Sequence, residues 1–383
     1  MLDEIIIQTK DGVMQIAGLE NGRLGEFVIY DEKKANEGNV YLGKITKKIQ
    51  TANGKEGYFV NIGASKEAFI NAEENDLEDL KAHEGQDIIV QVVQEQRAEK
   101  GARMSRFLRL AGVYLVYCPY GSDIEISTKI IDETARERLY RLIADNSETG
   151  GWIVRTIAAE SGDNEILAEM SKLKTLFAGI ITEAKNSKAP ALLSAKNNVL
   201  QDMIYHHMDG LRRVVVNNHL LQDELDKILP AEYAASPFAE AGIDDMLEEA
   251  LRKTVNLNCG GRVIIEETRA CTAIDVDSGE GTAQGGFGCL NQEAAAEIVR
   301  QIILRNLSGK IVIDFAGIAE FKYLKKALDI LTEGLADDPA RGRVLGLTRA
   351  GNVEIIRTRR RPSLRDLLTE ECSVCMGTGR VEK

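Results

Sequence analysis

Aspartates interrupt an apolar run in the segment "ACTAIDVDSGEG" (270–281). Asp275 and Asp277 are two residues apart, so on a β-strand both side chains project from the same face. Asp314 ends another apolar run, "IVIDF", in the same way. Because a carboxylate at the end of a buried strand costs free energy unless something pairs with it, these three residues are candidates for chemistry.

If the two strands are neighbours in one sheet, their carboxyl ends bring Asp275, Asp277 and Asp314 together. Crowded carboxylates repel one another, and a divalent cation relieves that repulsion. Magnesium binds one or two carboxylates and keeps positions for water and for substrate phosphate oxygens. The pattern therefore predicts a magnesium site of the kind that hydrolyses phosphodiesters.

Two other interpretations apply to these aspartates. The stretch "DVDSGE" begins like a calcium-binding loop, but Gly279 takes the third ligand position and Glu280 takes the position that requires glycine, which excludes that loop. In the other interpretation, each aspartate is a turn or cap residue after a strand, which is common. The residues alone leave this second interpretation open.

Cys372 and Cys375 form a close pair in "CSVCMGTG", whereas the other cysteines of the chain stand singly. Structural zinc takes four ligands, and this pair supplies two. Three interpretations stay open: a redox-active pair, a free surface dithiol, and one zinc ion shared between two chains. The segment lacks the strand–helix context of thioredoxin-like redox sites, and a shared zinc ion would make the protein a dimer.

Residues 36–106 contain strand-like runs separated by turn signals, with glycines within or just after them. Short strands of this number predict a small closed barrel of the OB type. Such barrels bind single-stranded nucleic acid through exposed aromatic and basic side chains. The candidate stacking residues are Tyr41, Tyr58, Phe59 and Phe69, and the candidate phosphate contacts are Lys44, Lys47, Lys48 and Lys100. In the alternative interpretation, half of these aromatic residues are barrel core.

Arg155 and Thr156 follow an apolar strand-like run in "GWIVRTIAAES". An arginine fork beside a hydroxyl group suits a phosphate monoester. The alternative is an ordinary surface arginine at the end of a strand.

The chain as a whole predicts a mixed α/β protein of two to four domains, because 383 residues are too many for one compact core. Residues 1–35 are expected to form a meander of strands. In the helical part of residues 107–210, apolar residues repeat at helical spacing at Ile166, Met170, Leu173 and Leu176. Residues 211–256 are expected as a strand and two helical pieces. Residues 257–368 are expected as strand, strand, long helix, strand, helix, strand and strand.

The net charge of −12 argues against a nucleic-acid partner, because a polyanion binds where Lys and Arg cluster. The segment "RTRRRPSLR" (357–365) is such a cluster, and it either builds a local basic surface or is simply solvated. No apolar run approaches the roughly 20 residues of a membrane span. The start "MLDEIIIQTKDG" lacks the basic region of a signal peptide, so we expect a cytoplasmic protein.

Several segments together resemble one family, the bacterial ribonuclease E/G endoribonucleases. They occur in the order of the family and span almost the whole chain. The segments are "NVYLGKITKKI", "FVNIGASKEAFI", "RAEKGARMSRFLRLAGVYLVY", "GWIVRT", "EETRACTAIDVDSG", "NQEAAAEIVRQIILRNLSGKIVIDF" and "CSVCMGTG".

The resemblance implies a fold of several subdomains. The barrel at 36–106 would be an S1-type RNA-binding domain, with Phe59, Phe69 and Lys100 at the positions of the RNA-channel residues. Residues 107–210 would be a 5′-sensor region, in which Arg155 and Thr156 match the pocket for a 5′-monophosphate. The remaining parts would be an RNase H-like subdomain (1–35 with 211–256), a DNase I-like catalytic subdomain (257–368) and a zinc-link (369–383).

The resemblance also implies two kinds of metal ion. Asp275 and Asp314 match the two magnesium ligands of the catalytic subdomain. Cys372 and Cys375 match the zinc-link, in which two protomers share one tetrahedral zinc ion, so a homodimer is expected.

The chain departs from the family pattern at several places. Asp277 stands where the family usually has asparagine, and its extra negative charge would tighten ion binding or repel the scissile phosphate. The stretch "FAGIAE" after Asp314, which contains Gly317, lacks an acidic residue usual in the family, and the segment around 230–245 looks shortened. The chain stops soon after the cysteine pair, so a dimer is expected rather than a tetramer.

The sequence therefore predicts a Mg²⁺-dependent endoribonuclease that cleaves single-stranded RNA by hydrolysis, with Asp275, Asp277 and Asp314 as its catalytic residues. The products would carry a 5′-phosphate and a 3′-hydroxyl, and RNAs with one 5′-phosphate would be favoured, in RNA processing or decay. The alternative is a non-catalytic RNA-binding dimer derived from the same family.

Overall fold

The structure is a computed structural model of the chain. It describes all residues except 1, 51–53, 78–79, 98–99, 196–198, 209, 227, 280–285, 318–320, 337, 376–378 and 380–383. The chain divides into two compact units. Unit 1 combines Met1–Ile29 with Gly210–Lys383, and unit 2 is Tyr30–Asp209. Part of the "FAGIAE" stretch, residues 318–320, lies outside the described residues.

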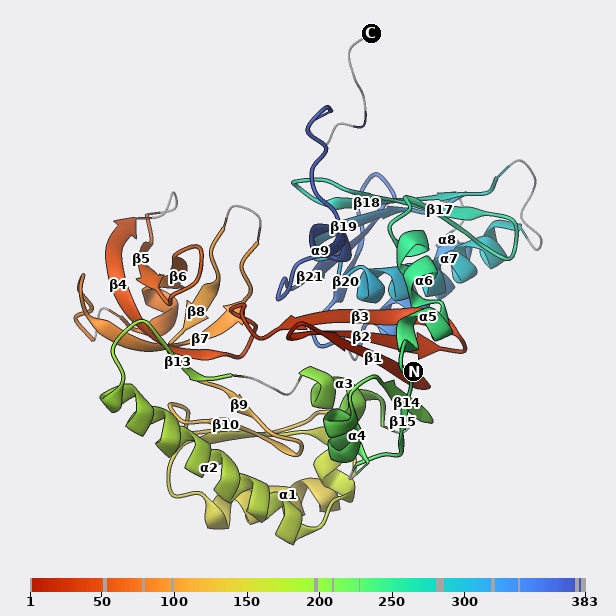
Figure 1. The fold of residues 1–383 in the computed structure, drawn as a ribbon. Coiled ribbons are helices and arrows are strands. Elements are labelled where there is room, and N and C mark those ends of the chain that lie inside the picture. Colours follow the sequence, from red (N-terminus) through yellow and green to blue (C-terminus); the bar gives the residue numbers. More distant parts are fainter. Residues whose placement is uncertain are drawn as a thin grey trace. The chain divides into compact units, whose positions relative to one another are not determined.

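The first sheet of unit 1 joins strands from the two separate segments of that unit. Its strand order is β15-β14-β1-β2-β3, and β1 runs parallel to β14 and antiparallel to β2 (Figure 1). The strands are β1 (Glu4–Lys10), β2 (Val13–Glu20), β3 (Arg23–Asp31), β14 (Arg213–Val216) and β15 (Ala231–Tyr233). The helices of this region are α4 (His219–Leu225), α5 (Pro237–Ala241) and α6 (Ile243–Ala250). Phe238, Ile243 and Leu247 bury their side chains in a core shared with Ile6 and Val215 of the sheet.

The second sheet of unit 1 carries the aspartates. Its order is β16-β17-β18-β19-β21-β20. The strands are β16 (Thr254–Asn256), β17 (Arg262–Glu267), β18 (Thr272–Asp277), β19 (Gly309–Asp314), β20 (Arg343–Leu347) and β21 (Val353–Arg357). Helices α7 (Gly286–Leu304) and α8 (Phe321–Gly334) lie against this sheet, and the short α9 (Leu364–Leu368) follows it.

Strict alternation along these strands decides which residues reach the open face. In β18, Thr272, Ile274 and Val276 are buried, and Ala273 and Asp275 are exposed. The buried residues pack against α7 and α8 in one core that includes Leu290, Ile298 and Leu331. Because successive strand residues point to opposite faces, the helices cover one face and the aspartates project from the other.

Unit 2 contains a closed barrel. Its strands are β4 (Val40–Gln50), β5 (Glu56–Asn61), β6 (Ala68–Asn71), β7 (Asp87–Gln94) and β8 (Arg103–Ser105), with the short 3₁₀ helix η1 (Glu73–Asn75). They pair in the order β4-β5-β6-β8-β7, and β4 pairs with β7 to close the barrel. An additional strand, β13 (Ala191–Ser194), pairs with the start of β4. A closed barrel of five strands is therefore present, which is consistent with the predicted OB type.

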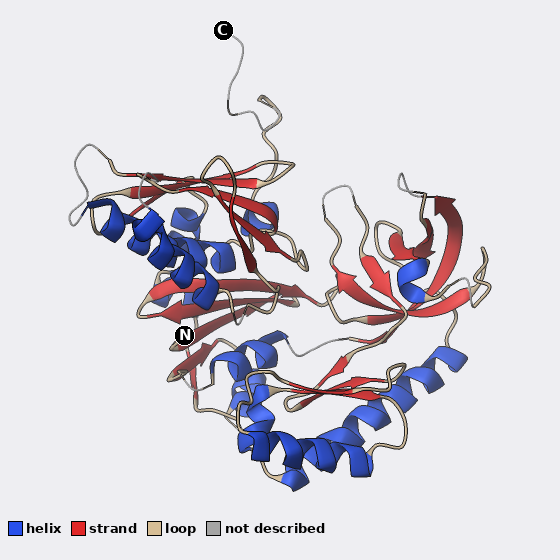
Figure 2. Ribbon diagram, turned by 180° about the vertical axis from the view of Figure 1, so that it is seen from behind, coloured by secondary structure: helices blue, strands red, loops and turns tan. Residues whose placement is uncertain are grey.

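A smaller sheet with two helices completes unit 2. Its order is β11-β12-β10-β9, from β9 (Leu110–Ala111), β10 (Leu115–Cys118), β11 (Ile124–Ile126) and β12 (Gly151–Val154). Helices α1 (Glu133–Asn146) and α2 (Asp163–Asn186) pack on it; α2 is the longest helix in Figure 2. The 3₁₀ helix η2 (Thr156–Glu160) and helix α3 (Val199–His207) follow β12 and β13 respectively.

One prediction for α2 was wrong in detail. Ile166, Met170 and Leu173 are buried as expected, but Leu176 is 42% exposed and Phe177 packs against the core instead. At 3.6 residues per turn, the buried stripe of a long helix must alternate steps of three and four, which brings Phe177 and not Leu176 to the inner face.

None of the helices in the described part of the chain combines the length and the hydrophobicity that crossing a bilayer requires.

Candidate active site

The two candidate metal ligands lie directly beside one another. Strands β18 and β19 are parallel neighbours, and their register pairs Asp275 with Asp314. Adjacent strands are about 4.8 Å apart, and residues in register point to the same face. Both side chains are exposed at the carboxyl ends of their strands. The predicted meeting of residues far apart in the sequence is therefore present.

The pKa of Asp275 reflects partial burial and the neighbouring carboxylates of Asp314 and Asp277. Partial burial raises the pKa of the Asp275 carboxyl, the negative charges of Asp314 and then Asp277 raise it further, and Arg262 opposes them. Anionic Asp275 is thus in an unfavourable environment that a bound cation would improve.

Asp277 is arranged differently. Its Oδ2 accepts hydrogen bonds from Nε and Nη2 of Arg262, the Nε bond at 2.8 Å, and its Oδ1 accepts one from the backbone N–H of Gly279 at 2.9 Å. The Gly279 hydrogen bond and then Arg262 lower the pKa of Asp277. Both carboxylate oxygens of Asp277 are therefore engaged, and its extra charge is balanced by a cation.

Arg262 is a residue that the sequence analysis missed. It begins β17, where it lies opposite Asp277 in the antiparallel β17–β18 hairpin. The signal was present, because the two strands of this hairpin were predicted and counting outward from their turn places Arg262 opposite Asp277.

Helix α7 holds the backbone that follows Asp314. The buried Asn291 donates from Nδ2 to the carbonyl of Ala316 at 2.9 Å. Gly317 has φ of +66°, and a Cβ there would approach the ring of Phe287 to 2.5 Å. The turn after the second aspartate therefore requires glycine at 317.

In the part of the chain that the structure describes, no three His, Cys, Asp or Glu side chains gather into a group that could hold a metal ion. Among the described residues, the candidate magnesium site thus consists of two carboxylates, those of Asp275 and Asp314.

The barrel presents two of the candidate aromatic residues on its surface. Phe59 and Phe69 are cross-strand partners on β5 and β6, both half-buried, with ring centroids 6.1 Å apart. Gly57 makes room for Phe69, since a Cβ there would lie 2.4 Å from that ring. Tyr41 and Tyr58 are 8% and 2% exposed and belong to the barrel core. The alternative interpretation therefore holds for these two tyrosines.

The candidate lysines form two groups, one in ion pairs with acidic side chains and one near the exposed faces of the barrel strands. Lys44 pairs with Asp87 and Lys48 with Glu56. Lys47 of β4 is exposed and lies opposite Phe59 of β5. Lys100 is exposed and forms an isolated β-bridge with Arg97. Two residues after Lys100, the carbonyl of Ala102 accepts a hydrogen bond from the N–H of Phe69. Lys47 and Lys100 thus remain candidates, and strand pairing places Lys47 directly opposite Phe59.

Arg155 and Thr156 lie where predicted, at the carboxyl end of β12. Strand pairing fixes the backbone there, because the N–H of Arg155 donates to the carbonyl of Tyr114. The Thr156 hydroxyl lies 2.9 Å from that of Ser127. Nη1 and Nη2 of Arg155 each lie 3.3 Å from Oδ1 of Asp202 on α3. A carboxylate partner for Arg155 had no signal in the sequence, because Asp202 is 47 residues away on another element.

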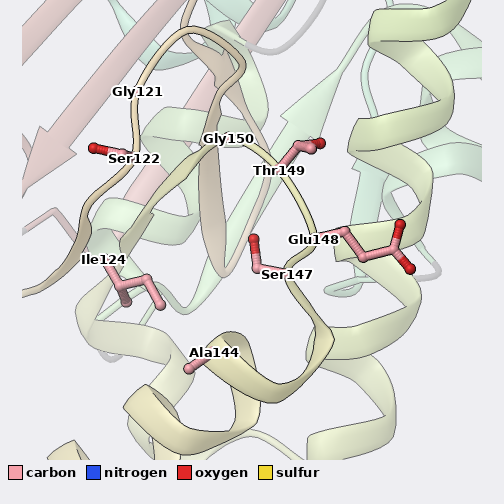
Figure 3. Close-up of a pocket in the computed structure, with 8 residues that line it drawn as sticks. All are labelled: Gly121, Ser122, Ile124, Ala144, Ser147, Glu148, Thr149 and Gly150. Carbon is pink, nitrogen blue, oxygen red and sulfur yellow. The ribbon is translucent and has the colours of Figure 1, made fainter.

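A surface pocket of about 340 Å³ lies at the other end of β12, as Figure 3 shows. Ser122, Ser147, Glu148 and Thr149 contribute its polar side chains. Gly150 lies at this end, five residues from Arg155, which is roughly 17 Å along a strand. The pocket is therefore separate from the candidate phosphate-binding residues.

The cysteine pair lies after α9. Cys372 is exposed and Cys375 half-buried, and neither forms a disulfide bond. Hydrogen bonds from the backbone N–H groups of Cys375 and Val374, and then the Cys375 thiol, lower the pKa of Cys372. A lowered pKa favours the thiolate, which is the metal-binding form.

Comparison with known proteins assigns the family. The model of the ribonuclease E/G family matches residues 109–360. The chain belongs to the ribonuclease E/G family. That membership agrees with the enzyme class expected from the sequence, an endoribonuclease.

Individual members of the ribonuclease E/G family align with nearly the whole chain. Ribonuclease G of Haemophilus influenzae is 31% identical over 421 residues, covering 99% of this chain and 84% of the relative. Ribonuclease G of Escherichia coli K12 is 28% identical and covers 100% of this chain and 85% of the relative. Ribonuclease E of a Nostoc species is 32% identical, covering 89% of this chain and 54% of the relative. The chain thus spans most of the length of the ribonuclease G relatives.

Proposed function

We propose that this protein is a Mg²⁺-dependent endoribonuclease that hydrolyses single-stranded RNA in RNA processing or decay, in the cytoplasm. The products would carry a 5′-phosphate and a 3′-hydroxyl. The observation that carries the proposal is the in-register pairing of Asp275 with Asp314 on adjacent parallel strands.

The donor set fits magnesium. Two exposed carboxylates meet at one sheet edge, and Asp275 has a raised pKa because burial and nearby charge disfavour its anion. Magnesium prefers one or two carboxylates and keeps positions for water and phosphate oxygens. When bound, it would polarise a phosphoryl oxygen and lower the pKa of an attacking water. Asp275 and Asp314 would hold it, while the turn at Ala316–Gly317, bonded to Asn291, keeps Asp314 in place.

The barrel would bind the RNA strand. Phe59 and Phe69 supply half-buried rings on which bases can stack, and Lys47 and Lys100 supply exposed positive charge. Single strands are favoured because their bases are free to stack on aromatic side chains. The closed topology of β4–β8 supports an S1-type domain of the OB class.

Arg155 and Thr156 would recognise a 5′-monophosphate. Arginine offers a planar fork of N–H donors that matches phosphate oxygens. Thr156 follows Arg155 in the chain, and its hydroxyl lies 2.9 Å from that of Ser127. This preference is part of the same proposal.

The subdomain names follow from the resemblance. The sheet order β3-β2-β1-β14-β15 supports the RNase H-like assignment, and the α7/α8-covered sheet would be the DNase I-like catalytic subdomain. Cys372 and Cys375 would form the zinc-link of a homodimer, since one pair supplies half of a tetrahedral site.

Cleavage of a 5′-monophosphorylated single-stranded oligonucleotide tests the catalytic proposal. We expect Mg²⁺-dependent cleavage that EDTA abolishes, and a loss of at least about 100-fold in Asp275→Asn and in Asp314→Asn, because removing an electrostatic contributor to a transition state costs that much. RNA binding without cleavage at any Mg²⁺ concentration would favour the alternative, a non-catalytic RNA-binding protein.

The same oligonucleotide with a 5′-hydroxyl tests the sensor. We expect Arg155→Ala to lower the ratio of kcat/KM between the 5′-monophosphate and 5′-hydroxyl substrates. Arg141→Ala, which removes an exposed arginine paired with Glu137 on α1, is the control. An unchanged ratio in Arg155→Ala would remove the assignment.

A further inference from the structure

The pair formed by Arg262 and Asp277 is not explained by metal binding. A carboxylate that served as a magnesium ligand would turn a lone pair of one oxygen toward the ion. In this structure Asp277 directs Oδ1 to the N–H of Gly279 and Oδ2 to two donors of Arg262. Both oxygens of Asp277 thus accept hydrogen bonds from protein donors, and two of these bonds hold the guanidinium of Arg262 in place.

Arg262 has donors left over. A guanidinium carries five N–H bonds, and Asp277 accepts from Nε and Nη2. Among the residues that the structure describes, no other hydrogen-bond or ion-pair partner of Arg262 is found. Its side chain is 47% exposed, so the remaining donors are accessible to a ligand.

The position of Arg262 relative to the aspartate pair is set by strand register. Arg262 lies opposite Asp277, and Asp277 follows Asp275 on the same face of β18. The positive charge of Arg262 therefore lies on the same face of the sheet as Asp275. Arg262 is level with Asp277, which is two residues further along β18.

We propose that Arg262 binds a phosphate of the RNA next to the cleaved linkage, and that Asp277 is a positioning residue that orients its guanidinium. The proposal rests on the proposed function, because it names a substrate contact of the same site. An arginine fork matches the oxygens of a phosphate diester. Holding one edge of the guanidinium against Asp277 leaves the other edge directed to substrate and reduces the entropy lost on binding.

The first test measures RNA binding without cleavage. A fluorescent single-stranded RNA with a 5′-hydroxyl is titrated in EDTA at several salt concentrations. We expect Arg262→Gln to weaken binding about threefold to tenfold and to reduce the slope of log Kd against log salt by about 0.7, the value for one phosphate contact on a single strand. Arg262→Lys keeps the charge without the fork, and we expect it to restore the slope but only part of the affinity.

Arg213→Gln is the matched control. Arg213 is also 47% exposed, and its Nε and Nη2 also donate to one carboxylate oxygen, that of Glu232, in the other sheet of unit 1. We expect its salt slope and affinity to equal those of the native protein. A slope unchanged in Arg262→Gln, or changed equally in Arg213→Gln, would overturn the assignment.

The second test is a double-mutant cycle on KM and on the Mg²⁺ concentration for half-maximal rate. If Asp277 acts through Arg262, Asp277→Asn raises KM in the native background but has no further effect in Arg262→Gln. The Mg²⁺ requirement then stays near that of the native protein. If Asp277 were a metal ligand, Asp277→Asn would raise the Mg²⁺ requirement in both backgrounds, which contradicts the inference.

The two proposals fail in different ways. If the native protein binds RNA but does not cleave it, the proposed activity fails, and the binding slope still tests Arg262. If the native protein cleaves and Arg262→Gln matches it in binding and in KM, the inference fails alone. Both residues are partly exposed, at 47% and 32%, and exposed ion pairs contribute only about 0–1 kcal/mol, so the variants are expected to fold; thermal unfolding checks this.

Discussion

At the scale of single residues, both candidate sites contain charged side chains that a ligand of opposite sign would contact. At Asp275 and Asp314, two carboxylates repel each other across adjacent strands. At Arg155, the carboxylate of Asp202 contacts the guanidinium that we propose for phosphate binding. Under the proposed function, a cation would relieve the repulsion between Asp275 and Asp314. A phosphate at Arg155 would instead have to compete with Asp202 for the guanidinium.

Replacing Asp275 with asparagine is expected to stabilise the protein in EDTA while abolishing activity. The pKa of Asp275 is raised in the folded state, so the folded state binds protons more tightly than the unfolded chain and loses stability as pH rises through that pKa. The gain in Asp275→Asn should be present at pH 7, on the order of 1–2 °C in the unfolding midpoint, and shrink toward pH 4. Differential scanning calorimetry measures it.

Added Mg²⁺ provides the control for that experiment. Because an ion that binds only the folded state raises its stability, the midpoint of the native protein should rise with Mg²⁺ and that of Asp275→Asn should not. Equal responses of the two proteins would contradict the assignment of Asp275 as a ligand.

Replacing Asp202 with asparagine is expected to strengthen the preference for a 5′-monophosphate. Asp202 accepts from both Nη atoms of Arg155 at 3.3 Å, and the two side chains are about one-third exposed. Removing one exposed ion pair frees about 1 kcal/mol or less, so the ratio of kcat/KM for 5′-monophosphate over 5′-hydroxyl RNA should rise about twofold to fivefold. A ratio that falls would show that Asp202 supports Arg155 rather than competing for it.

At the scale of elements, a buried ion pair joins strand β21 of the second sheet of unit 1 to the loop that follows α8. Asp338, after α8, accepts from Nε and Nη2 of Arg357 on β21 at 2.7 and 2.9 Å, and from the N–H groups of Ala340 and Gly342. Arg357 also donates to the carbonyl of Leu307. Although burial alone would raise the pKa of Asp338, Arg357 and these backbone donors lower it.

Replacing Asp338 with asparagine is therefore expected to destabilise unit 1 by about 3–5 kcal/mol, since it leaves the buried guanidinium of Arg357 without a counter-charge. Glu248→Gln removes an exposed ion pair between Glu248 on α6 and Arg252 just after that helix, and should change stability by less than about 0.5 kcal/mol. Denaturant unfolding measures both. Because the pKa of Asp338 is lowered, the contribution of the native pair is present above pH 4 and is lost in acid. A small effect of Asp338→Asn at pH 7 would contradict this account.

At the scale of the whole molecule, the zinc proposal makes the assembly depend on two residues. Cys372 and Cys375 supply two thiols, and a tetrahedral zinc site needs four ligands. We expect half an equivalent of zinc per chain in a dimer, and loss of both in Cys372→Ser. Light scattering and metal analysis measure this, with Cys289→Ser, an exposed cysteine on α7, as the control. A dimer that persists without zinc would contradict the shared site, and a full equivalent of zinc per chain would do so as well.

Local patterns in the chain were sufficient to predict most elements and the identities of the candidate residues. The alternation in "TAIDVD" predicts a strand with one buried face, and 3.6-residue periodicity predicts α2 and α7, because periodicity reports on a single surface of an element. The same patterns could not separate the core residues Tyr41 and Tyr58 from the surface residues Phe59 and Phe69, since a closed barrel buries one face of every strand.

Which elements become neighbours was decided by packing over long distances in sequence. The pairing of Asp275 with Asp314 requires β19 to lie beside β18 with α7 crossing between them, and that choice depends on burying α7 and α8 against one sheet. The contact of Arg155 with Asp202 likewise depends on where α3 docks. Periodicity shows which face of an element is buried, but the partner that buries it is selected by the free energy of the whole fold.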